Sequence, residues 1–183
     1  EKLTKYKNLI FFISPFMFVI FVEDIFQNVS FKVRLFLMTL TALTISIFWI
    51  ESFPIINHIP IISKILEVEI FAIIFFSFAL IGTMNGVNFI DGMNGLAALT
   101  CLGAFITCIQ LSFLVNDSQA FMNLIPWIIM LLIFLLFNYP FGKIFLGDSG
   151  AYFLGFLIGI WLIDFFAKHS QISSWNALLI LFY

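Results

Sequence analysis

Residues 68–96 read VEIFAIIFFSFALIGTMNGVNFIDGMNGL, a nearly continuous apolar run that passes directly into a stretch rich in Asn, Asp and Gly. The apolar part, residues 68–87, is long enough to cross a bilayer core of about 30 Å, which takes about 20 helical residues. In the polar part, Asn85, Asn88 and Asp91 recur every three residues and Asn94 continues the row, a spacing that turns side chains toward one face of a helix. The segment therefore predicts a membrane-spanning helix with a polar site at its end.

The rest of the chain has the same apolar character. Of its 183 residues, 63% are hydrophobic and 10% are charged, whereas soluble domains have about 45–50% apolar and about 25% charged residues. The alternation typical of a transmembrane β-barrel is absent. We therefore expect residues 1–183 to form a single all-α, polytopic transmembrane domain. Six complete spans and one partial span are predicted, at residues 8–22, 35–51, 68–87, 95–115, 123–139, 150–167 and 174–183.

Charge and cysteine content argue against a nucleic-acid partner and against a disulfide bond. The net charge is −2 and the Lys and Arg residues are scattered, so we predict no nucleic-acid partner. Cys101 and Cys108 are about two helical turns apart in one apolar segment, too far for a disulfide, and are interpreted as packing residues.

Consecutive spans alternate direction, so every second connection lies at the same membrane surface. We call side one the surface that carries the connections at residues 23–34, 88–94 and 140–149. The opposite surface, side two, carries Asp117, His58 and His169 in loops of ordinary turn composition, which we interpret as solvated loop residues. The acidic residues of side one sit instead in Gly- and Asn-rich frames or beside bases, and they are Glu23, Asp24, Asp91 and Asp148.

The acids of side one suit a divalent cation. Asp148 lies just before the sixth span and could be its N-cap, but a cap does not explain Lys143 and Asn138 at the same surface. Three carboxylate-bearing loops could assemble around a cation that bridges carboxylates to phosphates. The chemistry indicated is phosphoryl transfer, with a lipid phosphate as the nucleophile.

At these loops the chain resembles the polyprenyl-phosphate N-acetylhexosamine-1-phosphate transferases, the glycosyltransferase family that includes phospho-N-acetylmuramoyl-pentapeptide transferase. Asn88-Phe-Ile-Asp-Gly-Met-Asn-Gly-Leu96 is similar to the family's Asn-x-x-Asp-Gly-x-(Asp/Asn)-Gly-Leu loop, and Lys143-Ile-Phe-Leu-Gly-Asp-Ser-Gly150 to its Lys-x-Phe-x-Gly-Asp-x-Gly loop. Glu23-Asp24 resembles the family's Asp-Asp pair in the form used by bacterial enzymes that initiate O-antigen or related surface glycans.

The resemblance implies an Mg²⁺-dependent enzyme, with Mn²⁺ as an alternative metal. Such an enzyme transfers N-acetylhexosamine-1-phosphate from a UDP-sugar to undecaprenyl phosphate and releases UMP, which initiates O-antigen lipopolysaccharide or another surface polysaccharide. The implied location is the bacterial inner membrane, with the active site at its cytoplasmic face, and a homodimer is one option for assembly. The sugar and the number of chemical steps stay open.

The resemblance also implies residue roles. Asp148 holds the metal with Asp91 beside it, and Asp24 contacts or deprotonates the lipid phosphate. Lys143 offsets the diphosphate charge. The remaining substrate-binding residues line the nucleotide pocket or, for Glu23, belong to the acidic pair, and they are Glu23, Asn88, Gly92, Asn94, Asn138 and Phe145. Glu23 replaces the first Asp of the pair and Asn94 replaces a second Asp used in several branches.

The family's two N-terminal spans and its C-terminal His-containing loop lie outside this chain. His58 and His169 fall on side two and cannot replace that loop. We therefore interpret the chain as a fragment of a larger active enzyme and expect it to be inactive alone.

Two other functions compete with this interpretation, and one observation opposes the orientation. Lipid I synthesis for peptidoglycan is the alternative within the family, and an ion-coupled transporter, with Asp164 inside a span, or a purely structural subunit is the alternative outside it. Side one carries fewer bases than side two, where Lys2, Lys5, Lys7, Lys64 and Lys168 lie, so the positive-inside rule favours the reverse orientation.

Overall fold

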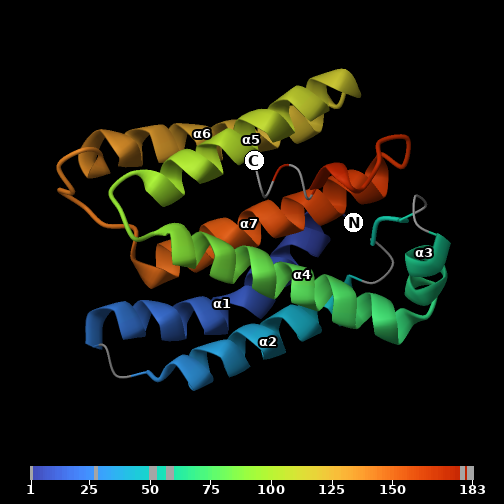
Figure 1. The fold of residues 1–183 in the computed structure, drawn as a ribbon, viewed down its shortest axis with the longest axis horizontal. Helices are drawn as coiled ribbons and strands as arrows, with labels where there is room; N and C mark the ends of the chain where they lie inside the picture. The colour runs from blue at the N-terminus through green and yellow to red at the C-terminus, as the bar shows by residue number, and fades with distance from the viewer. Residues whose placement is uncertain (1, 27–28, 50–52, 57–59, 178–179, 181–183) are drawn as a thin grey trace.

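The computed structural model of the chain describes residues 2–26, 29–49, 53–56, 60–177 and 180, and for residues 2–9 the backbone alone (Figure 1). Within these residues all regular secondary structure is helical, as the sequence predicts. The helices are α1 (Lys2–Phe26), α2 (Phe31–Phe48), α3 (Pro60–Leu66), α4 (Glu69–Ile90), α5 (Leu96–Leu114), α6 (Ser118–Asn138) and α7 (Gly147–Lys168).

Five helices in the described part of the chain, α2 and α4 to α7, are long and apolar enough to cross a membrane. They match five predicted spans, and α1 covers the predicted span at residues 8–22. In the predicted partial span at 174–183, residues 178–179 and 181–183 lie outside the described residues. The short helix α3 lies in a predicted connection, where Pro60 takes the first helical position that suits its fixed φ and missing N–H.

The helices run back and forth so that three connections meet at one end of the bundle. Figure 1 shows the α1–α2, α4–α5 and α6–α7 connections together at the left end. These are the three predicted connections of side one, and the predicted grouping is therefore confirmed.

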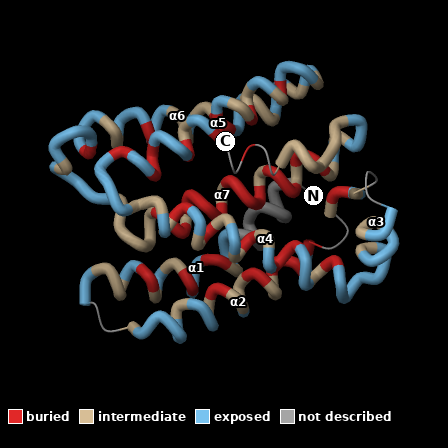
Figure 2. Tube along the Cα trace, viewed as in Figure 1, coloured by how far each residue is buried: buried red, intermediate tan, exposed pale blue. Residues whose placement is uncertain are grey.

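The helix α7 lies at the centre of the bundle. It contacts α1, α4 and α5, and in its apolar window 67% of the residues are buried, against 11% in α6. Figure 2 shows the contrast between the two helices. The exposed side chains of α6, such as Ile133 and Leu136, have the apolar character that a lipid-facing helix needs.

Two glycines let α7 approach α4 closely. A Cβ atom added at Gly155 would lie 2.5 Å from the Thr83 carbonyl oxygen and 2.6 Å from the Met84 Cα, both of them backbone atoms. One turn later, a Cβ at Gly159 would lie 2.7 Å from the Thr83 hydroxyl oxygen. Small residues four apart allow this backbone contact between membrane helices, where dispersion replaces the hydrophobic effect. The contact positions the start of α7 beside the end of α4.

Candidate functional site

The start of α7 collects polar groups from three other helices. Asp148, in the first turn of α7, contacts side chains from α2 and α4, while its backbone N–H contacts a side chain from α1. All of them lie at the side-one end. The sequence predicted that these loops assemble, and the contacts show how.

Asp24 of α1 caps α7. Its Oδ1 accepts a hydrogen bond from the Asp148 N–H and its Oδ2 from the Ser149 N–H, both at 3.0 Å. A helix N-terminus attracts an anion because its first N–H groups have no partner within the helix. Gly147 has φ +70° and no room for a Cβ, which would lie 2.9 Å from the Asp24 Oδ2. Asp148 therefore lies within the first turn of α7, and the capping carboxylate comes from α1.

Both carboxylate oxygens of Asp148 have side-chain donors. The Asn88 amide donates to Oδ1 at 2.9 Å, and the Arg34 guanidinium forms an ion pair with Oδ2. Arg34 is the last residue of the connection at residues 23–34 that the sequence assigns to side one, but it was not predicted as a site residue. A usable signal existed, because a base in the first turn of a helix opposes the helix dipole and calls for another partner.

Asp91 follows the last residue of α4 and lies on the same surface. Burial, and then the negative charge of Asp148, raise the pKa of Asp91 above its ordinary value. The two carboxylates are thus close enough to repel each other, which a divalent cation would relieve. Carboxylates of this kind fit Mg²⁺, which binds one or two of them together with substrate phosphates.

The expectation that three carboxylates surround one cation needs correction. Among the described residues no group of three His, Cys, Asp or Glu side chains is arranged to hold a metal. Both oxygens of Asp24 accept hydrogen bonds from backbone N–H groups of α7. Of the three carboxylates, those of Asp91 and Asp148 are the two that do not cap the N-terminus of a helix.

The buried side chain of Asn138 connects the α4–α5 loop to the α6–α7 loop. It is only 5% exposed, its Oδ1 accepts the Gly95 N–H at 2.5 Å, and its Nδ2 donates to the Ile144 carbonyl at 2.8 Å. The exposed Asn94 makes a second connection between these loops, because its amide donates to the Pro140 carbonyl at 3.2 Å. The pocket-lining role predicted for Asn138 does not fit this burial, since its amide is already satisfied by the loops.

The predicted row of polar residues on one face is broken by the end of the helix. Asn85 donates to the Ile81 carbonyl at 3.0 Å and to the Met38 sulfur, whereas Asn88 reaches α7. Helix α4 ends at Ile90, so Asn94 lies in the following turn. The spacing of three therefore predicted neighbours but not a continuous stripe.

Of the four remaining predicted site residues, one makes a structural contact and three are exposed. Glu23 accepts the Val29 N–H at 2.6 Å and so closes the α1–α2 connection. Gly92, Lys143 and Phe145 are exposed at the same end of the bundle, and Phe145 is 78% exposed. They are free to meet a ligand from the aqueous side.

At side two, Asp117 and His169 make specific contacts with the protein, although they were predicted to be solvated loop residues. Asp117 accepts the Ala120 N–H at 2.9 Å and contacts His169 at 2.9 Å, and these two contacts, the backbone one more strongly, hold the pKa of Asp117 below its ordinary value. The prediction that both are simply solvated is wrong. Asp164 pairs with Lys168, and His58 lies outside the described residues.

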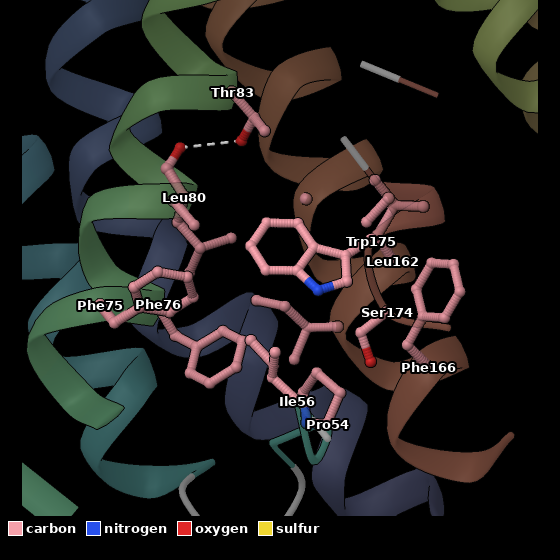
Figure 3. Close-up of a pocket in the computed structure, with 14 residues that line it drawn as sticks. Pro54, Ile56, Phe75, Phe76, Leu80, Thr83, Leu162, Phe166, Ser174 and Trp175 are labelled. Carbon is pink, nitrogen blue, oxygen red and sulfur yellow. Dashed lines mark hydrogen bonds between the residues drawn. The ribbon is translucent and has the colours of Figure 1, made fainter. Parts of the chain in front are cut away.

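An apolar cavity lies between α4 and α7 in the half of the bundle toward side two (Figure 3). Its volume is about 120 Å³, and the Trp175 indole points into it. None of the predicted site residues lines it. Without charged groups it offers no phosphate chemistry, so the polar cluster at side one remains the candidate site.

The chain matches one family model and several curated relatives. Residues 7–166 match the family model described as Glycosyl transferase family 4. A phospho-N-acetylmuramoyl-pentapeptide-transferase of Leuconostoc mesenteroides is 37% identical over 67% of this chain and 38% of its own length. Proteins of the same name from Leuconostoc citreum and Nitratiruptor sp. are 33% and 29% identical over 69% and 73% of this chain, and over 39% and 43% of their own length.

The family match covers the motifs at all three side-one connections, while the chain spans about two fifths of the length of these curated relatives. Its apolar helices make it part of a multi-pass membrane protein. On the strength of the family match, the chain belongs to glycosyl transferase family 4.

Proposed function

We propose that the protein containing this chain transfers a sugar-1-phosphate from a UDP-sugar to a polyprenyl phosphate. The observation that carries the proposal is the convergence of α1, α2 and α4 on Asp148 at one membrane surface. A lipid phosphate and a soluble nucleotide can meet only at such a surface. A lipid phosphate oxygen attacks the β-phosphorus, the bond from that phosphorus to the bridging oxygen breaks, and UMP leaves.

Asp91 and Asp148 would hold Mg²⁺ or Mn²⁺, which supplies positive charge to offset that of the phosphates. Asp24 acts in our proposal by fixing the start of α7, and so the place of Asp148, through two backbone hydrogen bonds. This role replaces the expected deprotonation of the lipid phosphate, because both oxygens of Asp24 are already engaged.

The nucleotide would bind at the exposed face of the two Gly- and Asn-containing loops. Gly92, Lys143 and Phe145 are exposed there, so they can offer close backbone approach, a positive charge and an aromatic face. Asn138 and Asn94 hold the two loops together. Because the nucleotide is made in the cytoplasm, side one would face the cytoplasm of a bacterial inner membrane.

Two donors compete. The curated relatives are named for transfer of phospho-N-acetylmuramoyl-pentapeptide, so lipid I synthesis is the better supported reaction and replaces the O-antigen function as our first choice. The second candidate is transfer of N-acetylhexosamine-1-phosphate for a surface polysaccharide. It is favoured by Glu23, which replaces the first Asp of the family's acidic pair, and by Asn94, which replaces an Asp used in several branches of the family.

The test is UMP release by the full-length protein with undecaprenyl phosphate and each donor in turn. We expect turnover with UDP-N-acetylmuramoyl-pentapeptide, and a loss of about 10²–10³-fold in Asp148→Asn, the range for removing one electrostatic contributor. The matched control is Asp117→Asn at side two, which should keep the rate. Turnover only with UDP-N-acetylhexosamines would select the second candidate, and an unchanged rate in Asp148→Asn would contradict the site.

A further inference from the structure

Arg34 stands in a place that its own helix does not favour. It lies in the first turn of α2, where no acidic residue accompanies it, and the partial positive charge of a helix N-terminus disfavours a base there. Its side chain is only 20% exposed and is directed to Asp148 of α7. The positive charge of Arg34 is therefore stabilised by Asp148 and not by the dipole of α2.

The ion pair leaves part of the guanidinium unused. Nη1 bonds to Asp148, while Nε is buried and has no hydrogen-bond partner in the described part of the chain. A guanidinium has five N–H donors in a planar fork that matches phosphate oxygens. Since a buried unpaired donor is costly, Arg34 retains capacity for an anion with several oxygens.

Arg34 and a metal ion would compete for the carboxylate of Asp148. Its Oδ1 accepts from Asn88 and its Oδ2 is paired with Arg34, so neither oxygen lacks a donor. A divalent cation placed against this carboxylate would compete for the same oxygens and would repel the guanidinium. Occupation by a cation therefore favours movement of Arg34 away from Asp148.

We propose that Arg34 is a positioning residue that neutralises Asp148 until a divalent cation binds, and then exchanges the carboxylate for a substrate phosphate. This inference rests on the proposed function, which supplies both the cation and the phosphate. The phosphate has two possible sources, the lipid phosphate and the nucleotide diphosphate. Arg34 would offset the charge of Asp148 before the cation binds. Afterwards the cation would offset that charge, and Arg34 would offset the charge of the substrate phosphate.

The first measurement is direct binding of Mn²⁺ to the purified full-length protein in detergent without substrates, followed by EPR. Arg34→Gln should lower the Kd for Mn²⁺ by up to about fivefold, because a competing cation of a partly exposed ion pair is removed. Arg34→Lys should stay near the wild type. Lys32→Gln, an exposed base in the same turn, is the matched control and should not change the Kd, while Asp148→Asn identifies the site by weakening it.

A structural role for Arg34 would weaken Mn²⁺ binding or leave it unchanged in Arg34→Gln, and either result would overturn the inference. The second measurement is the KM for each substrate. A rise confined to undecaprenyl phosphate assigns the phosphate to the lipid, a rise confined to the UDP-sugar assigns it to the nucleotide, and no rise in either contradicts the exchange.

UMP release by the wild type, measured on the same preparation, separates the two proposals. Turnover by the wild type together with an unchanged Mn²⁺ Kd in Arg34→Gln would reject the role of Arg34 alone. Absence of turnover with every donor would reject the proposed function, even where Mn²⁺ binding follows the expected order.

Discussion

At the scale of single residues, Asn138 illustrates how a polar side chain can organise a site without facing a ligand. In Asn138→Ala, the Gly95 N–H and the Ile144 carbonyl lose their partner beneath the loops. The Gly95 N–H is buried, and an unsatisfied buried group costs about 1–3 kcal/mol, whereas Ile144 is 41% exposed and its carbonyl can accept a hydrogen bond from water. We therefore expect a clear fall in Tm of the full-length protein in detergent.

The matched control is Asn94→Ala, at the exposed hydrogen bond to Pro140. Exposed groups regain hydrogen bonds from water, so the Tm should move little. Equal shifts in the two variants would show that burial of Asn138 is not what makes its amide important.

The sequence predicts which residue types belong to the site more reliably than it predicts their partners. Asp24, Asp91 and Asp148 were predicted at one surface and are found there. The cap from Asp24 to α7 and the pair between Arg34 and Asp148 join residues more than a hundred positions apart. No local spacing contains such contacts, because they depend on how α1 and α2 pack against the bundle.

At the scale of elements, the contact between α4 and α7 depends on Gly155. Its closest neighbours are backbone atoms of Thr83 and Met84, which cannot turn aside. Gly155→Val should therefore separate the helices and cost about 1–3 kcal/mol or more, as overpacking does, with a fall in Tm and in UMP release together.

Gly103→Ala on α5 is the control for the loss of a glycine. A Cβ there meets nothing within 4 Å, and Ala is about 1 kcal/mol better than Gly in a helix interior, so the Tm should hold or rise. A harmless Gly155→Val would mean that α4 and α7 do not pack closely.

The helices themselves were predictable, because apolar length in a membrane chain leaves few other structures. Their ends were less so. α4 continues to Ile90, beyond the predicted span, since Asn85 and Asn88 find partners on neighbouring helices. The close packing of α7 had a usable signal in Gly155 and Gly159, two small residues four apart, which was not drawn from the sequence.

At the scale of the whole molecule, the alternation of spans placed three distant loops at one end, and the structure agrees (Figure 1). Alternation relates the loops to one another but does not say which compartment they face. The charge count opposes the proposed function here, because the bases Lys64 and Lys168 lie toward side two, whereas the proposed UDP-sugar donor requires side one to face the cytoplasm.

A cysteine-labelling experiment decides between them. Met93→Cys places an exposed thiol at side one and Ser170→Cys at side two, and the native Cys101 and Cys108 are each 1% exposed, so their background should be low. In intact cells that express the full-length protein, a membrane-impermeant maleimide should label Ser170→Cys and spare Met93→Cys, and permeabilised cells should label both. The proposed function leads us to expect this pattern, since the loops of side one would then have to meet a UDP-sugar where it is made. Labelling of Met93→Cys in intact cells would instead place side one outside the cytoplasm, and the proposed donor could not reach the loops.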